Sequence, residues 1–162
     1  MEESMNIEEI YLKEKLINSY FSKKYDYNDV DIFNKQVLEL ICELSEFAYE
    51  TKCFKYWKDE KQSSPDITIP EFADCLMITL CFCDLADIDN LVIEKIDETD
   101  IVKLFIDTNR LASSLTINID KDVILKILSN LLAISKLLDY TEEELNKYCL
   151  VKMEKTLKMI RE

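Results

Sequence analysis

Residues 32–58 read IFNKQVLELICELSEFAYETKCFKYWK, and their apolar side chains recur every three to four positions. That spacing places them on one side of an α-helix, because a helical turn takes 3.6 residues. The apolar stripe consists of Val37, Leu40, Ile41, Leu44, Phe47 and Ala48. We therefore expect a long amphipathic helix from about Ile32 to Lys58, with this stripe buried in the core.

An acidic row follows the same helix beside the apolar stripe. Its members, Glu39, Glu43, Glu46 and Glu50, are separated by four, three and four residues. Like charges at these spacings destabilise a helix by roughly 0.2–0.5 kcal/mol per pair. No lysine or arginine lies within the row to offset that cost. The repulsion indicates that the row serves something other than stability.

A second acidic pair opens the next expected helix. Residues 59–70 contain both prolines and a Ser-Ser pair, which predicts a loop there and a helix that starts after Pro70. This helix is apolar on most sides from Phe72 to Phe82, which predicts a central place in the core. Glu71 and Asp74 are the charges at its start.

If the two helices pack antiparallel, Glu43 and Glu46 face Glu71 and Asp74. Four carboxylates then meet at one point, an oxygen-rich set that suits a hard divalent ion such as Mg²⁺, which Mn²⁺ could replace. Other acidic pairs share the spacing, namely Asp26/Asp29, Asp84/Asp87, Glu94/Asp97, Asp97/Asp100 and Asp139/Glu142. Those pairs fall in expected loops and helix ends, where exposure to solvent explains them.

The remaining segments also show helical periodicity. Further helices are expected at about Ile7–Lys24, Glu98–Leu115 and Asp120–Leu138, with polar linkers at 26–31 and 84–90. Thr141 and Glu144 match a capping box that starts a last helix. The sequence thus predicts an all-α bundle of five to six helices that forms one domain over residues 1–162.

The chain has no glycine and no histidine among its 162 residues. The absence of glycine excludes phosphate-binding loops of the P-loop or dinucleotide-binding type, because their backbones approach phosphate too closely for a side chain. The absence of histidine excludes Ser-His-Asp and Cys-His catalysis and imidazole metal sites. Catalysis or metal binding in this chain would therefore depend on carboxylate side chains.

Charge and cysteine usage bear on partners and location. The net charge of −13 disfavours nucleic acid and anionic membranes as partners. The six cysteines lie mostly in apolar runs with no signal peptide before them, so reduced, buried thiols and a cytoplasmic location are expected. Cys81-x-Cys83 has the wrong spacing for half a zinc site, and packing explains it better.

Between the two acidic pairs lies Phe54-Lys55-Tyr56-Trp57. With Glu43-x-x-Glu46 before it and Glu71-x-x-Asp74 after it, this stretch resembles the dimeric all-α dUTPases of the MazG-like nucleoside triphosphate pyrophosphohydrolase superfamily. The matching part covers residues 33–82, about a third of the chain. The Phe-Lys-Tyr-Trp stretch is its most specific feature.

The resemblance implies a homodimer that binds a nucleotide, with dUTP as the leading substrate. It implies that Mg²⁺ ions are held by Glu43, Glu46, Glu71 and Asp74. Water then attacks the α-phosphorus and releases the monophosphate and pyrophosphate. It also suggests Glu46 as the catalytic residue that orients or deprotonates the water, Lys55 as a phosphate contact and Trp57 as a nucleoside contact.

Some positions depart from the family pattern. The family usually has Asn at the position of Tyr49 and His at that of Met77, and both are associated with holding deoxyuridine. Glu14 falls about where the family has a uracil-reading Gln, and Asn18 lies one turn on, so both are candidate substrate-binding residues. The family's C-terminal phosphate-binding stretch is represented by Lys152, a further candidate.

Three functions therefore stay open. The first is hydrolysis of dUTP to dUMP and pyrophosphate. The second is a house-cleaning pyrophosphatase for another nucleotide, because the metal half of the motif is intact while the base-reading half is altered. The third is a non-catalytic helical interaction homologue whose acidic row binds a metal structurally. Pyrophosphate release from a panel of nucleotides discriminates among them.

Overall fold

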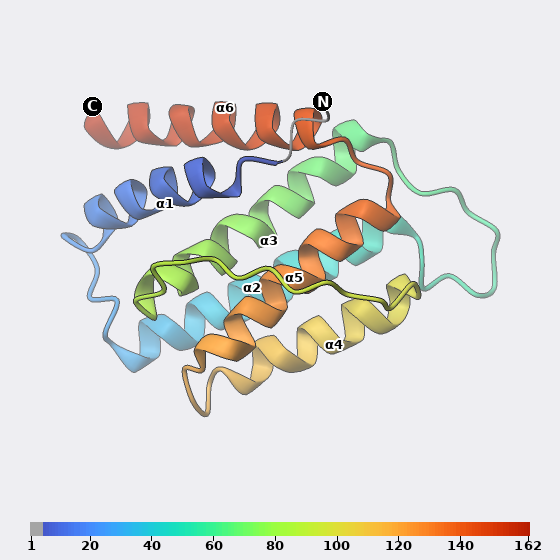
Figure 1. Ribbon diagram of the computed structural model, residues 1–162, viewed down its shortest axis with the longest axis horizontal. Helices are drawn as coiled ribbons and strands as arrows, with labels where there is room; N and C mark the ends of the chain where they lie inside the picture. Colours follow the sequence, from blue (N-terminus) through green and yellow to red (C-terminus); the bar gives the residue numbers. More distant parts are fainter. Residues whose placement is uncertain (1–4) are drawn as a thin grey trace.

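The computed structural model describes residues 5–162, which form six α-helices and no strand (Figure 1). The helices are α1 (Ile7–Phe21), α2 (Val30–Thr51), α3 (Pro65–Leu85), α4 (Ile101–Ser114), α5 (Lys121–Leu137) and α6 (Glu142–Arg161). α3 lies at the centre and contacts α1, α2, α5 and α6. α1 and α6 lie side by side on one side of it, with α2, α4 and α5 on the other. The expected all-α fold is confirmed.

Side-chain caps begin several of these helices. Asp29, Asp100 and Asp120 each accept a hydrogen bond from a backbone N–H in the first turn of α2, α4 and α5. The capping box expected at Thr141 and Glu144 is present at the start of α6. α4 begins slightly later than expected, because Asp100 is its cap and residues 98–99 precede it.

The expected end of the second helix is wrong. α2 ends at Thr51 rather than at Lys58, because Lys52 adopts a left-handed backbone conformation with a φ of 60°. Residues 52–64 then form a loop that projects to the right of the bundle in Figure 1. The Phe-Lys-Tyr-Trp stretch therefore lies in this loop and not on the helix.

The expected start of the third helix is also wrong. α3 begins at Pro65 rather than after Pro70. Proline is well tolerated at the first helical position, where its missing N–H has no helical partner in any case. Pro70 lies inside the helix and leaves the carbonyl of Asp66 without its usual backbone donor.

Aromatic contacts fix the antiparallel register of α2 and α3. Phe33 packs on Phe82 with ring centroids 5.4 Å apart, and Phe47 packs on Phe72 at 6.0 Å, nearer the other end of the pair. Each buried phenylalanine contributes about 1.5–3 kcal/mol of hydrophobic stabilisation. Because Phe47 packs on Phe72, the acidic residues directly before them, Glu46 and Glu71, also come close together across the two helices.

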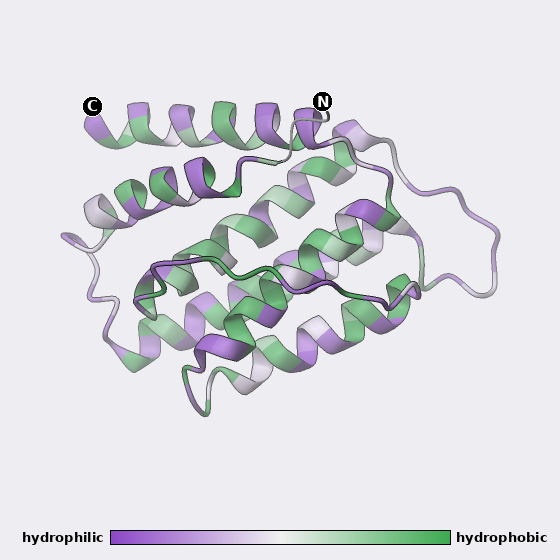
Figure 2. Ribbon diagram, viewed as in Figure 1, coloured by the Kyte–Doolittle hydropathy of each residue, from purple (hydrophilic) through white to green (hydrophobic). Residues whose placement is uncertain are grey.

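The C-terminal helix is amphipathic. Its buried residues, Leu145, Cys149, Met153 and Leu157, recur every fourth position. Figure 2 shows the result as alternating hydrophobic and hydrophilic bands along α6. This stripe packs on α1 and α3, so Lys152, next to Met153, is held at the edge of the interface with α3.

All six cysteines are free thiols. The expected burial holds for Cys75, Cys81, Cys83 and Cys149, whereas Cys42 is exposed. In residues 5–162 no helix combines the length and the apolar character needed to cross a membrane.

Candidate active site

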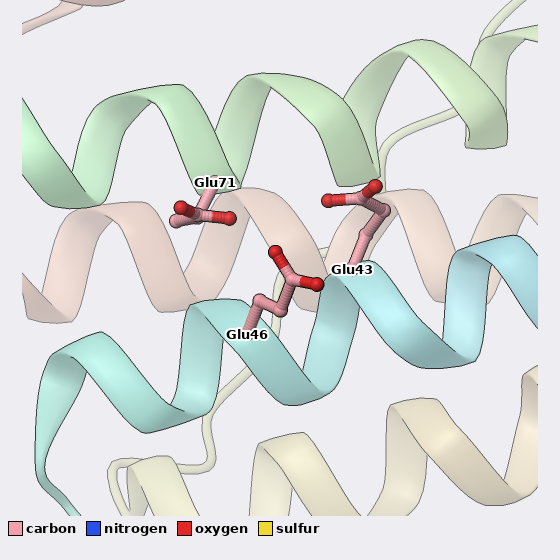
Figure 3. Close-up of side chains that lie close together, drawn as sticks. All are labelled: Glu43, Glu46 and Glu71. Atoms are coloured by element: carbon pink, nitrogen blue, oxygen red, sulfur yellow. The ribbon is translucent and has the colours of Figure 1, made fainter.

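Acidic side chains from α2 and α3 converge on the space between the two helices. Glu43 and Glu46 extend from α2 and Glu71 from α3, and one carboxylate oxygen of each lies within 4.8 Å of the others (Figure 3). Glu46 is exposed, while Glu43 and Glu71 are half-buried. We call these three residues the acidic triad.

The chemistry of the triad fits a small, hard cation. Mg²⁺ binds oxygen ligands at about 2.0–2.1 Å in an octahedron, so its ligand oxygens lie roughly 3–4 Å apart. The triad oxygens, within 4.8 Å of one another, are close to that spacing. Carboxylates are also ligands that Mg²⁺ and Mn²⁺ prefer. The triad could therefore hold a divalent ion and leave positions open for water and substrate.

Burial and crowded negative charge raise the pKa of two triad carboxyl groups, those of Glu43 and Glu71. Partial burial, followed by repulsion from Asp74 and the neighbouring glutamates, raises the pKa of Glu43 to about 7. Burial and the same kind of repulsion raise the pKa of Glu71, and Lys152 opposes this effect. A cation in the triad would relieve the repulsion and lower both pKa values.

Asp74 lies one turn of α3 after Glu71 but outside the triad. Its Oδ1 accepts a hydrogen bond from Nζ of Lys152 in α6, and both side chains are about one-third exposed. Asp74 is nevertheless the strongest charge that acts on Glu43. The structure thus brings together two candidate site residues that are 78 positions apart in the sequence.

Lys55 and Trp57 lie in the 52–64 loop. Nζ of Lys55 forms an ion pair with Glu60 and lies 5.5 Å from the ring centroid of Tyr49. The side chain of Trp57 is 61% exposed and packs edge-on against Tyr56, with ring centroids 5.2 Å apart. Both candidates are thus held by contacts within the loop and its junction with α2.

Glu50, the last member of the acidic row, fastens this loop to α2. Its Oε2 accepts a hydrogen bond from Oγ of Ser63 at 2.5 Å, and its backbone carbonyl accepts one from the N–H of Ser63 at 3.0 Å. Nζ of Lys52 lies 3.6 Å from the same carboxylate. Glu50 therefore closes the loop, and its charge is partly compensated.

Glu14 and Asn18 lie on α1 against the C-terminal end of α3. Nδ2 of Asn18 donates a hydrogen bond to Oδ2 of Asp84 at 3.0 Å. Glu14 is buried, with 7% of its surface exposed. Burial, followed by repulsion from Asp84, raises the pKa of Glu14 to about 8. Glu14 is therefore largely protonated at neutral pH.

Asp84 is a residue that the sequence pattern misassigns. The pattern places it in a solvated linker, but α3 continues to Leu85, so Asp84 lies half-buried in the last turn of the helix. Its partner, Asn18, is 66 positions away in the sequence. No local feature distinguishes Asp84 from the other acids of residues 84–90.

A protein-family model described as dUTPase matches residues 6–161. The chain belongs to this family. The match extends far beyond residues 33–82, which carry the resemblance seen in the sequence, and it confirms the all-α dUTPase resemblance. It makes the chain a hydrolase that acts on dUTP, in nucleotide metabolism. Neither the curated proteins nor the solved structures gave a match.

The candidate residues of this dUTPase-family chain form three groups along the α2–α3 pair. The 52–64 loop follows the C-terminal end of α2, and the Glu14–Asn18–Asp84 group lies at the opposite end, where α3 finishes. The acidic triad lies between them.

Proposed function

We propose that this dUTPase-family chain hydrolyses dUTP to dUMP and pyrophosphate, with Mg²⁺ bound by Glu43, Glu46 and Glu71 and with Mn²⁺ able to replace it. The observation that carries the proposal is the convergence of three carboxylate oxygens within 4.8 Å of one another. The match of the dUTPase family model to residues 6–161 supports it. Asp74 is the proposed fourth ligand.

The proposed chemistry is attack by water on the α-phosphorus. Bound Mg²⁺ supplies neutralisation of phosphate charge and a lower pKa for water. Glu46 is the proposed general base, because it is the exposed member of the triad and is accessible to water. The water oxygen bonds to the α-phosphorus, the bond from that phosphorus to the bridging oxygen breaks, and pyrophosphate leaves with the electron pair. Glu46 accepts the proton.

Lys55 and Lys152 are proposed to contact phosphate oxygens. Each ammonium group already pairs with a carboxylate, Glu60 or Asp74, at a partly exposed position. A phosphate group could replace either carboxylate, because it offers a charged oxygen of the same kind. Trp57 is proposed to contact the nucleoside, since its exposed indole offers a flat apolar surface.

Glu14 and Asn18 are proposed to read the base. A protonated carboxyl group offers an O–H donor beside a carbonyl acceptor, the same pair that a Gln amide offers. Uracil presents the complementary pair, an N–H beside a carbonyl oxygen. Asp84 accepts from Nδ2 of Asn18 and thereby leaves the amide oxygen of Asn18 free to accept from a ligand. Glu14 can therefore replace the Gln that is usual in the family.

Pyrophosphate release from dUTP and a panel of other nucleotides, with Mg²⁺ present, tests the proposal. We expect turnover of dUTP well above that of the other nucleoside triphosphates. Similar turnover of several nucleotides would instead support a house-cleaning pyrophosphatase. Turnover of none would refute both enzymatic functions and leave the helical interaction homologue.

We also propose that the protein is cytoplasmic, that each chain forms one domain and that two chains form a homodimer. The resemblance to the dimeric enzymes supports the dimer, and exposed apolar side chains such as Leu12 and Leu38 offer contact surface. The net charge of −13 supports the absence of nucleic-acid and membrane partners. Light scattering should give twice the chain mass of 19.1 kDa, and a single chain mass would contradict the dimer.

A further inference from the structure

The contact between Lys152 and Asp74 places the C-terminal helix in charge contact with the candidate metal site. Lys152 lies between Cys149 and Met153, both fully buried, so its backbone is fixed while its ammonium group remains partly exposed. Asp74 lies on α3 in the same helical row as Glu71. The ion pair therefore links α6 directly to the α3 side of the acidic triad.

The ammonium group of Lys152 also acts on the triad. Asp74 is the strongest charge raising the pKa of Glu43, and Lys152 lowers that of Glu71. Lys52 also compensates acidic charge, but its partner is Glu50, the last residue of the acidic row and not a member of the triad. Lys152 is thus the cation that faces the centre of the site from α6, where it partly compensates acidic charge at the position proposed for a divalent ion.

We infer that Lys152 is a placeholder cation that competes with the divalent ion for Asp74. When the ion binds, Asp74 exchanges Lys152 for the ion, and the released ammonium group becomes available to an anionic ligand such as a phosphate oxygen. This inference rests on the proposed metal site. It adds that Lys152 neutralises Asp74 when no divalent ion is bound. Metal binding and anion binding are then coupled through this single ion pair.

Competition of this kind has a consequence for metal affinity that a purely structural role does not have. Removing the placeholder leaves Asp74 unpaired beside Glu43, so a divalent ion should bind more tightly when no nucleotide is present. A lysine that only anchored α6 would, when removed, loosen the helix and leave metal affinity unchanged or weaker. The direction of the change therefore separates the two roles.

The test is calorimetric titration of the nucleotide-free full chain with Mg²⁺. Lys152→Met should bind Mg²⁺ roughly three- to tenfold more tightly than wild type, since a partly exposed ion pair is worth about 1 kcal/mol and 1.4 kcal/mol is tenfold. Lys155→Met is the matched control, because it removes the same charge from an exposed position of the same helix. Equal or weaker affinity of Lys152→Met relative to Lys155→Met would overturn the inference.

A double-mutant cycle keeps the result independent of folding defects in one variant. In an Asp74→Asn background the placeholder has no carboxylate to occupy, so adding Lys152→Met or Lys152→Gln should change the Mg²⁺ affinity by less than about twofold. An undiminished gain in that background would contradict the exchange.

Pyrophosphate release from dUTP is measured separately. Tighter Mg²⁺ binding without turnover would support the exchange and refute the proposed function, whereas turnover with unchanged affinity would do the reverse.

Discussion

Nδ2 of Asn18 lies 3.0 Å from Oδ2 of Asp84, so a hydrogen bond joins the end of α1 to the last turn of α3. Glu14 lies one turn before Asn18 and shares this interface. Its buried carboxyl group faces the charge of Asp84, with the ionisable groups of Tyr27 and Cys81 nearby. Two ionised carboxylates would repel each other here, which favours the protonated form of Glu14.

Glu14 should make the stability of the protein depend on pH. Its pKa is about 8 in the folded chain against an ordinary value of 4.5, so the folded state binds the proton more tightly than the unfolded chain does. The contribution of Glu14 to the free energy of unfolding is therefore fully present below about pH 4.5 and is lost as the pH rises through about 8. Between about pH 5 and about pH 8.5, thermal or denaturant unfolding should report a loss of roughly 2–4 kcal/mol.

The variant Glu14→Gln isolates this effect, because the amide has the same size and no charge. Its free energy of unfolding should stay flatter over the same pH range, and its advantage over wild type should grow toward alkaline pH. Glu8→Gln, at an exposed position of the same helix, is the control and should follow the wild-type pH profile. Parallel profiles for Glu14→Gln and wild type would show that Glu14 is ionised in the folded protein.

Mg²⁺ should stabilise the folded protein. A ligand that binds only the folded state adds about 2.7 kcal/mol at a concentration of 100 times its Kd. In this chain the ion would also relieve the repulsion that, after partial burial, raises the pKa values of Glu43 and Glu71. The measurement is the shift in Tm when Mg²⁺ is added to protein freed of metal with a chelator.

Replacing all three triad glutamates with glutamine gives the control for this shift. The triple variant keeps the size of each side chain and removes the repulsion, so without metal it should be more stable than wild type. Its Tm should no longer respond to Mg²⁺. A response as large as that of wild type would place the ion elsewhere.

Glu46→Gln should remove turnover while leaving the fold intact. Loss of a general base typically lowers the rate by about 10²–10⁴-fold. Glu46 is exposed, so its substitution should leave helicity by circular dichroism unchanged. Glu39→Gln, one turn before Glu43 in the same acidic row and outside the triad, is the control. Turnover of Glu46→Gln close to that of the control would assign the base to another residue.

Asp74→Asn should also abolish turnover with unchanged helicity. The substitution removes a proposed ligand and leaves Lys152 without its carboxylate. An amide oxygen is a weaker ligand for Mg²⁺ than a carboxylate, so the Kd for Mg²⁺ should rise. Asp66→Asn, in the first turn of α3, is the control. Wild-type turnover in Asp74→Asn would exclude Asp74 from the metal site.

The parts of the fold that follow from local chemistry could be predicted from the sequence. The apolar stripe of α2, the apolar circumference of α3 and the capping box at Thr141 each depend on residues within a few turns of one another. The convergence of the triad followed from an assumed antiparallel packing, which the Phe33–Phe82 and Phe47–Phe72 contacts bear out.

The features that could not be predicted depend on single dihedral angles or on distant partners. The left-handed conformation of Lys52 ends α2 seven residues before the expected limit of Lys58, and no glycine marks the position. The ion pair of Lys152 with Asp74 and the hydrogen bond of Asn18 to Asp84 join helices far apart in the sequence. Such pairs are fixed by how helices pack, and a pattern within one helix does not contain them.

Trp57→Ala should weaken substrate binding without destabilising the protein. The indole is 61% exposed, so its removal should leave Tm nearly unchanged, whereas stacking of an aromatic ring on a base is worth about 1–3 kcal/mol. The KM for dUTP should therefore rise roughly 5- to 150-fold, with a smaller change in kcat. Tyr56→Ala is the matched control, because this neighbouring ring is 94% exposed in the same loop. Equal KM values for the two variants would show that Trp57 does not contact the nucleoside.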